Sequence, residues 1–274
     1  MKKLYAIFVN FNSGGELYGG VKSVIMFPSV SQVLIVDNGS TDDSLIKIEK
    51  LNSKRITIFK NPRNLGFYKA VNIGIKKAIE KGADCVILLD FDLDFSSDFI
   101  SKLLKVDADI VAPVLKFKRE GKWVYDYGGR INWLLGRSTH LEKENPIPTR
   151  EAAKSSSDQK NVNSYDFISG GATIIKKKVI EKIGLFDEDY FVYYGDTDFT
   201  IKARGEGFKV VADPNTIVHH KLEIAKKTRN IKKLKIALSD NLKFIKKNIS
   251  WYFKPFAYGY ISLLCIKVIL NLYL

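Results

Sequence analysis

A chain of 274 residues, 46% of them hydrophobic and 27% charged, is long enough for one large α/β domain or two small ones and too apolar to be disordered throughout. Its two cysteines, Cys85 and Cys265, lie far apart in apolar surroundings. This argues against a disulfide scaffold or a Cys-x-x-Cys metal site and indicates reduced thiols in a cytosolic protein. The net charge of +14 points to an anionic partner, either nucleic acid or a membrane surface.

The first 115 residues alternate between apolar runs and helical segments. Strands are predicted at 4–9, 32–36, 56–59, 85–89 and near 110–115, and helices at 21–27, 43–51 and 67–81. The polar stretch 10–15 cuts the first apolar run short, so a strand explains it better than a signal peptide. This alternation predicts an α/β fold with a mostly parallel central sheet flanked by helices.

The pattern changes between about residues 116 and 165. Gly128-Gly129 and Pro146-Ile147-Pro148 indicate a variable excursion, with a loop at 142–163. Regular structure is expected to resume at Asp166, with a helix over 177–183 and a strand over 209–212.

The C-terminal segment has a composition of its own. Residues 221–247 carry ten lysine or arginine residues against two acidic ones, and the apolar stretch 256–274 follows the aromatic residues 251–253. This order predicts helices over 223–274 that run from basic and amphipathic to apolar and associate with an anionic membrane surface. A bilayer span and a core or dimerisation helix are the alternatives. Nucleic acid is not expected, since only the basic run favours it.

Three carboxylates follow the predicted strand 85–89 at alternate positions. If the chain stays extended, Asp90, Asp92 and Asp94 point to one side, at the strand end where open α/β sheets bind ligands. Their mutual repulsion raises their pKa values unless a cation neutralises them. The alternative is a solvated acidic loop.

Other polar segments have a structural and a functional interpretation. Residues 36–42 form an Asx turn with an N-cap, or a helix N-terminus that faces an anion or a base edge. Asp196 and Asp198 begin a predicted helix, where they stabilise its dipole or, among aromatic residues, give an acid with the raised pKa of a general base. The pair His219-His220 is incidental or, with Asp, a donor set for Mn²⁺.

In their order along the chain, these segments resemble the family 2 glycosyltransferases, which have the GT-A (Rossmann-like) fold. The resemblance rests on Val-Asn-Phe-Asn (9–12), Val-Asp-Asn-Gly-Ser-Thr-Asp (36–42), Asn-Xaa-Gly (64–66), Asp-Phe-Asp (90–92), Ser-Gly-Gly-Ala (169–172), Gly-Xaa-Phe-Asp (184–187), Asp-Xaa-Asp (196–198) and Pro-(Xaa)₅-His (214–220). With Gly-Gly-Arg-Ile-Asn-Trp (128–133), the chain is most similar to the rhamnosyltransferase-like enzymes of surface-polysaccharide assembly.

The resemblance covers about residues 4–222. It implies a GT-A domain over 1–222, with a nucleotide-binding half (1–115) and an acceptor-side half (116–222), before the membrane-associating helices. It implies that Asp196 is the general base and that Asp92 and His220 hold Mn²⁺ or Mg²⁺. The nucleotide would contact Phe11, Asp37, Asn64, Gly66 and Asp90, and the acceptor Ser169, Gly170, Gly171 and Asp198.

The implied activity is inverting transfer of a sugar from a dTDP-, UDP- or GDP-linked donor to a hydroxyl of a glycan or lipid-linked acceptor. The enzyme would work at the inner face of the cell membrane, with dimerisation through the apolar tail left open. Two residues depart from the family pattern: Gly195 stands where glutamate often precedes the base, and Asp90 is often asparagine in the subgroup. Gly195 leaves a non-catalytic, membrane-docked scaffold that binds nucleotide-sugar or glycan as the alternative.

Overall fold

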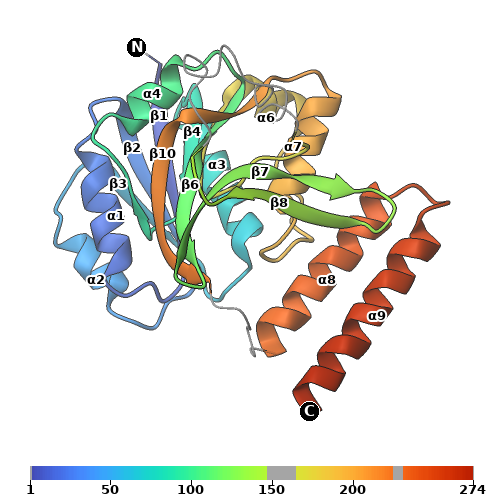
Figure 1. The fold of residues 1–274 in the computed structure, drawn as a ribbon. Coiled ribbons are helices and arrows are strands. Elements are labelled where there is room, and N and C mark those ends of the chain that lie inside the picture. The colour runs from blue at the N-terminus through green and yellow to red at the C-terminus, as the bar shows by residue number, and fades with distance from the viewer. Residues whose placement is uncertain (1, 147–164, 225–230, 274) are drawn as a thin grey trace.

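A ten-stranded mixed sheet forms the centre of the computed structural model, which describes residues 2–146, 165–224 and 231–273 (Figure 1). Its first four neighbours are parallel and lie in the order β3 (Ile56–Lys60), β2 (Val30–Asp37), β1 (Leu4–Asn10) and β4 (Cys85–Leu89). The order continues with β9 (Ala172–Lys176), β6 (Ile110–Arg119), β10 (Val210–Ile224) and β5 (Leu93–Asp94).

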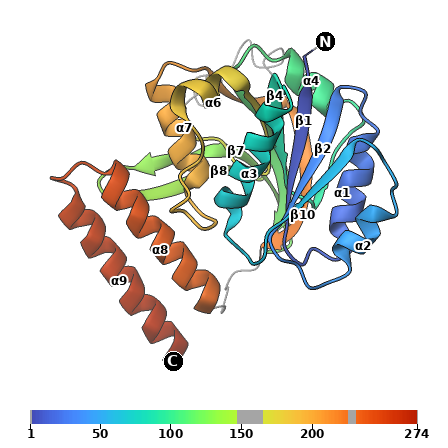
Figure 2. The same cartoon turned by 180° about the vertical axis from the view of Figure 1, so that it is seen from behind.

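The helices cover both faces of this sheet (Figures 1 and 2). One face carries α1 (Glu16–Ile25), α2 (Ser44–Glu49) and α4 (Phe99–Lys105). The other carries α3 (Phe67–Glu80), α6 (Lys177–Ile183) and α7 (Gly195–Gly205). The sequence of β4 is apolar throughout because all five residues are buried. Val86 and Leu88 lie on one face of the sheet, and Cys85, Ile87 and Leu89 lie on the other.

The four parallel strands and the helices between them confirm the predicted α/β fold, but the sheet is mixed further along. Strand β9 runs antiparallel to both β4 and β6, and β5 runs antiparallel to β10. The variable excursion is largely a long hairpin of β7 (Lys122–Asn132) and β8 (Arg137–Lys143). Of the loop predicted at 142–163, residues 147–163 lie outside the described ranges.

Two C-terminal helices, α8 (Ile231–Asn248) and α9 (Lys254–Tyr273), lie side by side beneath this hairpin (Figures 1 and 2). Phe244 and Ile245 of α8 are fully buried in the same core as α3 and α7. The side chain of Asn241 donates to the carbonyl of Gly136 in the hairpin turn (2.8 Å). The segment predicted as a tail therefore packs against the β7–β8 hairpin and the face of the sheet that carries α3 and α7.

Over the ranges that the structure describes, none of the helices combines enough length with enough apolar character to cross a bilayer.

Candidate active site

A cluster of two carboxylates and an imidazole lies where β4 ends. Pairing of β5 with β10 brings His220 opposite Leu93, so that its Nε2 is 3.7 Å from Asp90 Oδ2 and 3.5 Å from Asp92 Oδ1. One donor atom from each of these three side chains lies within 4.8 Å of the others. Two carboxylate oxygens and one imidazole nitrogen form a donor set that suits Mn²⁺. Asp90, expected at the nucleotide, thus also belongs to the metal-capable cluster.

The ionisable groups of this cluster shift one another's pKa values. Burial raises the pKa of Asp92, the nearby His220 lowers it, and the charge of Asp90 raises it again, so that it ends above its ordinary value. Burial disfavours the charged form of His220, but the two carboxylates raise its pKa overall. Asp94 does not join the cluster: it is exposed and lies 3.3 Å from Lys221 Nζ and 3.7 Å from His219 Nδ1.

The expected nucleotide residues begin at the carboxyl ends of β1 and β2. Asp37 is buried and accepts hydrogen bonds from the side chain of Asn10 (2.8 Å) and the backbone N–H groups of Gly39 (3.2 Å) and Ser40 (3.1 Å). Phe11, directly after β1, is a residue 45% exposed at this edge. An exposed aromatic face beside a fixed carboxylate can stack on a base and accept from its N–H groups.

The loop before α3 closes the same edge. Asn64 accepts from the backbone N–H of Gly66 (2.9 Å), and the carbonyl of Gly66 accepts from the side chain of Asn38 (3.0 Å). Asn38 directly follows Asp37, so its hydrogen bond to Gly66 joins the loop after β2 to the loop before α3. The predicted nucleotide residues of these two loops therefore lie together.

Asp196 lies at the start of α7 and lines a pocket of about 250 Å³ that Asp90 also lines. Burial raises the pKa of the Asp196 carboxyl, and the N–H of Thr197 (2.7 Å) and the charge of His140 only partly oppose this. A half-buried carboxylate with a raised pKa has the proton affinity that a general base needs.

Residues 170 and 171 separate the two acidic groups. A Cβ atom built on Gly170 would lie 3.1 Å from Asp196 Oδ2, and one on Gly171 would lie 3.2 Å from Asp90 Oδ2. Side chains here would therefore crowd the space between the base and the metal-capable cluster. Because both residues are glycines, this part of the pocket stays open. An acceptor bound between Asp196 and Asp90, as predicted for Gly170 and Gly171, needs that space.

Gly195 lies against the ring of Tyr68 from α3. A Cβ at this position would come within 2.5 Å of the ring, so no other residue fits while Tyr68 is in place. The hydroxyl of Tyr68 in turn contacts Asp196, accepting from its backbone N–H at 3.1 Å. At position 195, where glutamate is often expected from the resemblance, the ring of Tyr68 from α3 occupies the space that a side chain would need.

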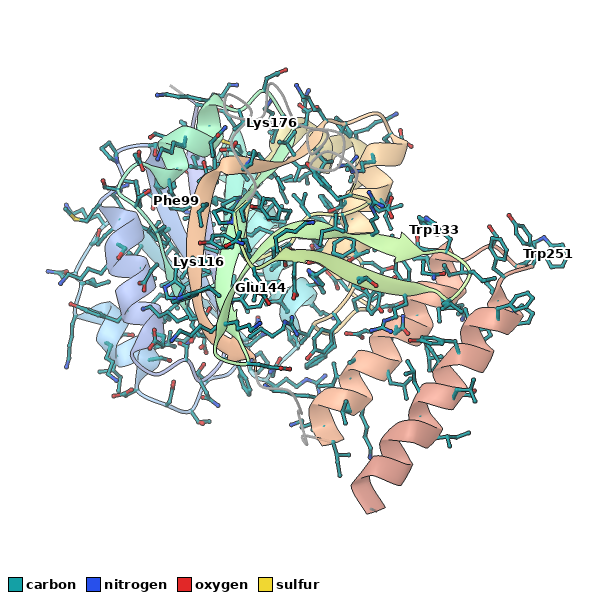
Figure 3. All side chains as sticks on the ribbon, in the orientation of Figure 1. Phe99, Lys116, Trp133, Glu144, Lys176 and Trp251 are labelled. Atoms are coloured by element: carbon teal, nitrogen blue, oxygen red, sulfur yellow. The ribbon has the colours of Figure 1, made fainter. Side chains whose placement is uncertain are left out.

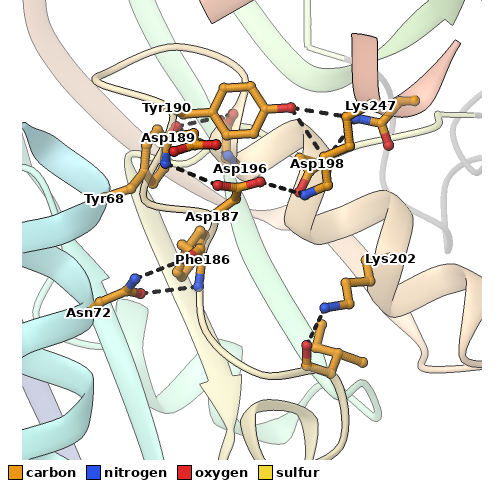
Figure 4. A network of polar contacts seen from close by, with 12 residues as sticks. Tyr68, Asn72, Phe186, Asp187, Asp189, Tyr190, Asp196, Asp198, Lys202 and Lys247 are labelled. Atoms are coloured by element: carbon orange, nitrogen blue, oxygen red, sulfur yellow. Dashed lines mark hydrogen bonds and ion pairs between the residues drawn. The ribbon is translucent and has the colours of Figure 1, made fainter. Parts of the chain in front are cut away.

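Asp198, expected at the acceptor, has structural partners instead (Figure 4). Its buried carboxylate pairs with Lys247 Nζ (2.7 Å) and accepts from the side chain of Asn248 (2.7 Å), both on α8. Lys247 also pairs with Asp187 (2.8 Å), which ties α8 to the loop before α7. These contacts tie Asp198 to the packing of α8, and its contact with the acceptor stays a prediction.

One further group, beside Asp196, was not predicted from the sequence. Asp126 of β7 is buried and accepts from Ser169 Oγ (2.7 Å), Gly128 N–H (2.9 Å) and His140 Nδ1 (2.8 Å). Burial disfavours the charge on His140, but the hydrogen bond and charge of Asp126 raise its pKa above the ordinary value. Only the pairing of β7 with β8 brings these side chains together, because 14 positions separate Asp126 from His140.

The fold and this site define a glycosyltransferase of the GT-A class. The chain belongs to glycosyl transferase family 2, whose model matches residues 5–184. It is 29% identical over 224 residues to the dTDP-rhamnosyl transferase RfbF of Shigella flexneri, covering 79% of this chain and 68% of the relative. It is 25% identical to the N-acetylglucosaminyl-diphospho-decaprenol L-rhamnosyltransferase of Mycobacterium tuberculosis, covering 69% of this chain and 66% of the relative.

Two solved structures share the fold. A crystal structure of GalNAc-T7 with UDP, GalNAc and Mn²⁺ superposes with a TM-score of 0.66 at 17% identity, over 90% of this chain and 48% of that chain. The mannosyltransferase PcManGT of Pyrobaculum calidifontis, in complex with GDP-Man and Mn²⁺, gives 0.59 at 16% identity, over 95% and 70%. The chain thus spans about half the length of the first structure.

Proposed function

We propose that this chain is an inverting glycosyltransferase that moves a sugar from a nucleotide-diphospho-sugar to a hydroxyl of a glycan or lipid-linked acceptor. The observation that carries the proposal is the pocket shared by Asp90 and Asp196, with Gly170 and Gly171 between them. It offers a cation site for the leaving diphosphate and a base for the attacking hydroxyl.

Asp90, Asp92 and His220 would hold a divalent ion, Mn²⁺ or Mg²⁺. When bound, such an ion neutralises charge on a diphosphate leaving group. The two structural neighbours, both described with Mn²⁺, support this assignment. Phe11 and Asp37 would receive the base, and Asn64 and Gly66 would line the same pocket.

Asp196 would accept the proton of the acceptor hydroxyl. It lines the pocket from α7, whereas the Asp90–Asp92–His220 cluster lies at the end of β4. A base and a leaving group on opposite sides of the anomeric carbon allow one direct displacement, which inverts its configuration. Ser169, fixed by Asp126, and the half-exposed His140 would orient the acceptor beside this base.

The names of two relatives support a more specific proposal for the donor sugar and the acceptor. Two rhamnosyltransferases, one named for a dTDP-linked donor and one for a diphospho-decaprenol acceptor, favour a dTDP-deoxyhexose over UDP- or GDP-linked sugars and favour a lipid-linked acceptor. The exposed aromatic residues Trp251, Tyr252 and Phe256 and the basic run 221–247 support docking on an anionic cytoplasmic membrane surface.

The non-catalytic alternative rested on Gly195. The ring and hydroxyl of Tyr68 fill that position and contact Asp196, so the departure has a local structural reason. We therefore favour the enzyme.

The experiment is a transfer and donor-hydrolysis assay with dTDP-, UDP- and GDP-sugars, comparing the native protein with Asp196→Asn and Asp92→Asn. Loss of a general base lowers rates by about 10²–10⁴-fold. Asp107→Asn is the control, because its carboxylate is 94% exposed in an ion pair with Lys209. Full activity in both site variants would refute the proposal.

A further inference from the structure

An apolar groove of about 490 Å³ lies between α8, α9 and the loop that precedes the base. Its walls include Leu234 and Leu238 of α8, Ile261 and Leu264 of α9, and the rings of Tyr193 and Tyr194. No role assigned above uses this groove.

Two cations line the groove among these apolar side chains. Arg137 of β8 donates to the hydroxyl of Tyr260 (2.5 Å), and its guanidinium lies 6.0 Å from the centre of that ring. Lys235 of α8 lines the wall as well. Among the described residues that line the groove, none is acidic. An apolar channel with two cations and no anion matches a ligand with a hydrocarbon part and a phosphate.

The groove adjoins the base. Tyr194 has a left-handed backbone (φ 65°) and caps α7, two positions before Asp196. The buried carboxylate of Asp240 on α8 fixes this loop by accepting from the N–H groups of Phe191 (3.1 Å), Val192 (3.0 Å) and Tyr193 (2.9 Å). The groove and the pocket that Asp196 lines are therefore walled by the same short loop, the groove by Tyr193 and Tyr194 and the pocket by Val192.

The hairpin and the helices that form the groove also expose apolar side chains. Trp133, at the turn of the hairpin, and Trp251, between α8 and α9, are exposed at the same outer end of the molecule (Figure 3). Leu263 and Ile266 are exposed on α9. Aromatic and aliphatic side chains around a groove with cations are typical of a surface that meets the interfacial layer of a membrane.

We propose that this groove binds the lipid chain of the acceptor, an isoprenoid linked to its sugar through a phosphate or diphosphate, and that Arg137 and Lys235 bind the phosphate. This inference rests on the proposed function and assigns α8 and α9 a role in acceptor recognition. The charge of the groove and its position beside Tyr194 favour the acceptor over bulk phospholipid, which need not approach the base.

Cys265 allows a direct test because it lines the groove. The only other cysteine, Cys85, is buried, and burial raises its thiol pKa to about 11, so it reacts slowly with thiol reagents. The rate of Cys265 modification by a maleimide is measured on the full chain with farnesyl diphosphate, inorganic diphosphate, farnesol or anionic phospholipid vesicles. Cys265→Ser identifies the reacting thiol.

We expect farnesyl diphosphate to slow modification at least tenfold, inorganic diphosphate to have no effect and farnesol to act only at higher concentration. Arg137→Gln should weaken the protection, and Arg137→Lys should retain most of it. Equal protection by phospholipid vesicles would make the groove a general membrane contact and overturn the proposal. So would unchanged reactivity with every probe, or a thiol blocked by dimerisation of the chain alone.

The same preparation separates this inference from the proposed function. Metal-dependent nucleotide binding is measured on each Arg137 variant, because that site lies on the other side of the pocket. Intact nucleotide binding with no lipid protection would overturn the groove alone. Absence of nucleotide binding in the native chain would overturn the proposed function.

Discussion

The hydroxyl of Tyr68 contacts both the backbone and the side chain of Asp196: it accepts from the backbone N–H at 3.1 Å and lies 3.4 Å from Oδ1 as a donor. Tyr68 is on α3 and Asp196 is on α7, 128 positions further along the chain. The proposed base is therefore positioned by a helix that begins at the nucleotide edge. This contact needs the close approach that Gly195 allows.

Replacing Gly195 by alanine should destabilise the protein, because the new Cβ would meet the Tyr68 ring at 2.5 Å. Overpacking of this kind costs about 1–3 kcal/mol. Gly19→Ala is the matched control. Gly19 lies in α1, and a Cβ atom at this position would have nothing within 4 Å, so alanine should stabilise the protein by roughly 0.5–1 kcal/mol. Urea unfolding measures both, and equal stability of the two variants would contradict the contact.

Asp196→Asn should raise the melting temperature at neutral pH while it lowers transfer. Burial raises the pKa of Asp196 in the folded state, so this carboxyl favours folding below its unfolded pKa of about 3.9 and loses that contribution as pH rises through the folded value. The stability gain of the variant should therefore appear as pH rises above that window and be absent well below it. A variant less stable than the native protein at pH 7 would contradict the raised pKa.

The Asp126–His140 contact predicts a histidine that titrates above its ordinary value of about 6.5. The stability from this pair is present below pH 6.5 and is lost as pH rises through the folded pKa. NMR titration of His140 should show this raised pKa, and Asp126→Asn should lower it. Glu142→Gln, which removes a more weakly acting carboxylate, should change it less. An unchanged titration in Asp126→Asn would refute the contact.

Asp240→Ala should weaken the structure around the base more than its surface neighbour Asp189→Ala. Asp240 is fully buried and accepts from three backbone N–H groups of the loop that precedes Asp196. A buried donor left without a partner costs about 1–3 kcal/mol. Hydrogen exchange at residues 191–193 should accelerate in Asp240→Ala alone, and equal exchange in both variants would show that α8 does not fix this loop.

The sequence predicted the elements whose local pattern reports burial, and missed those that depend on pairing. Strand β4 was predictable because both of its faces are buried, which makes its sequence apolar at every position. The direction of β9 was not, because a run of five residues that is mostly buried fits a parallel or an antiparallel neighbour equally well. Family motifs singled out Asp92, His220 and Asp196 as candidates. Tyr68, Asp126 and His140 could not be singled out, because their contacts join segments that are distant in the sequence.

The basic run shows the same limit. The count of charges over 221–247 predicted a basic surface that associates with an anionic membrane. In the structure, however, Lys243 lies 3.2 Å from Asp240, and Lys247 pairs with Asp187 and Asp198. Part of that charge is therefore neutralised within the fold. A linear count cannot show this, because Asp187 and Asp198 are far away in the sequence.

The central claim is a nucleotide-sugar site that depends on the Asp90–Asp92–His220 cluster. Its most direct test is thermal unfolding with dTDP, UDP and GDP, each with and without Mn²⁺, on the native protein and Asp92→Asn. A ligand at a hundred times its dissociation constant adds about 2.7 kcal/mol of stability. We predict a Mn²⁺-dependent increase with one nucleotide that Asp92→Asn abolishes. No increase with any nucleotide, or the same increase in Asp92→Asn, would contradict the account.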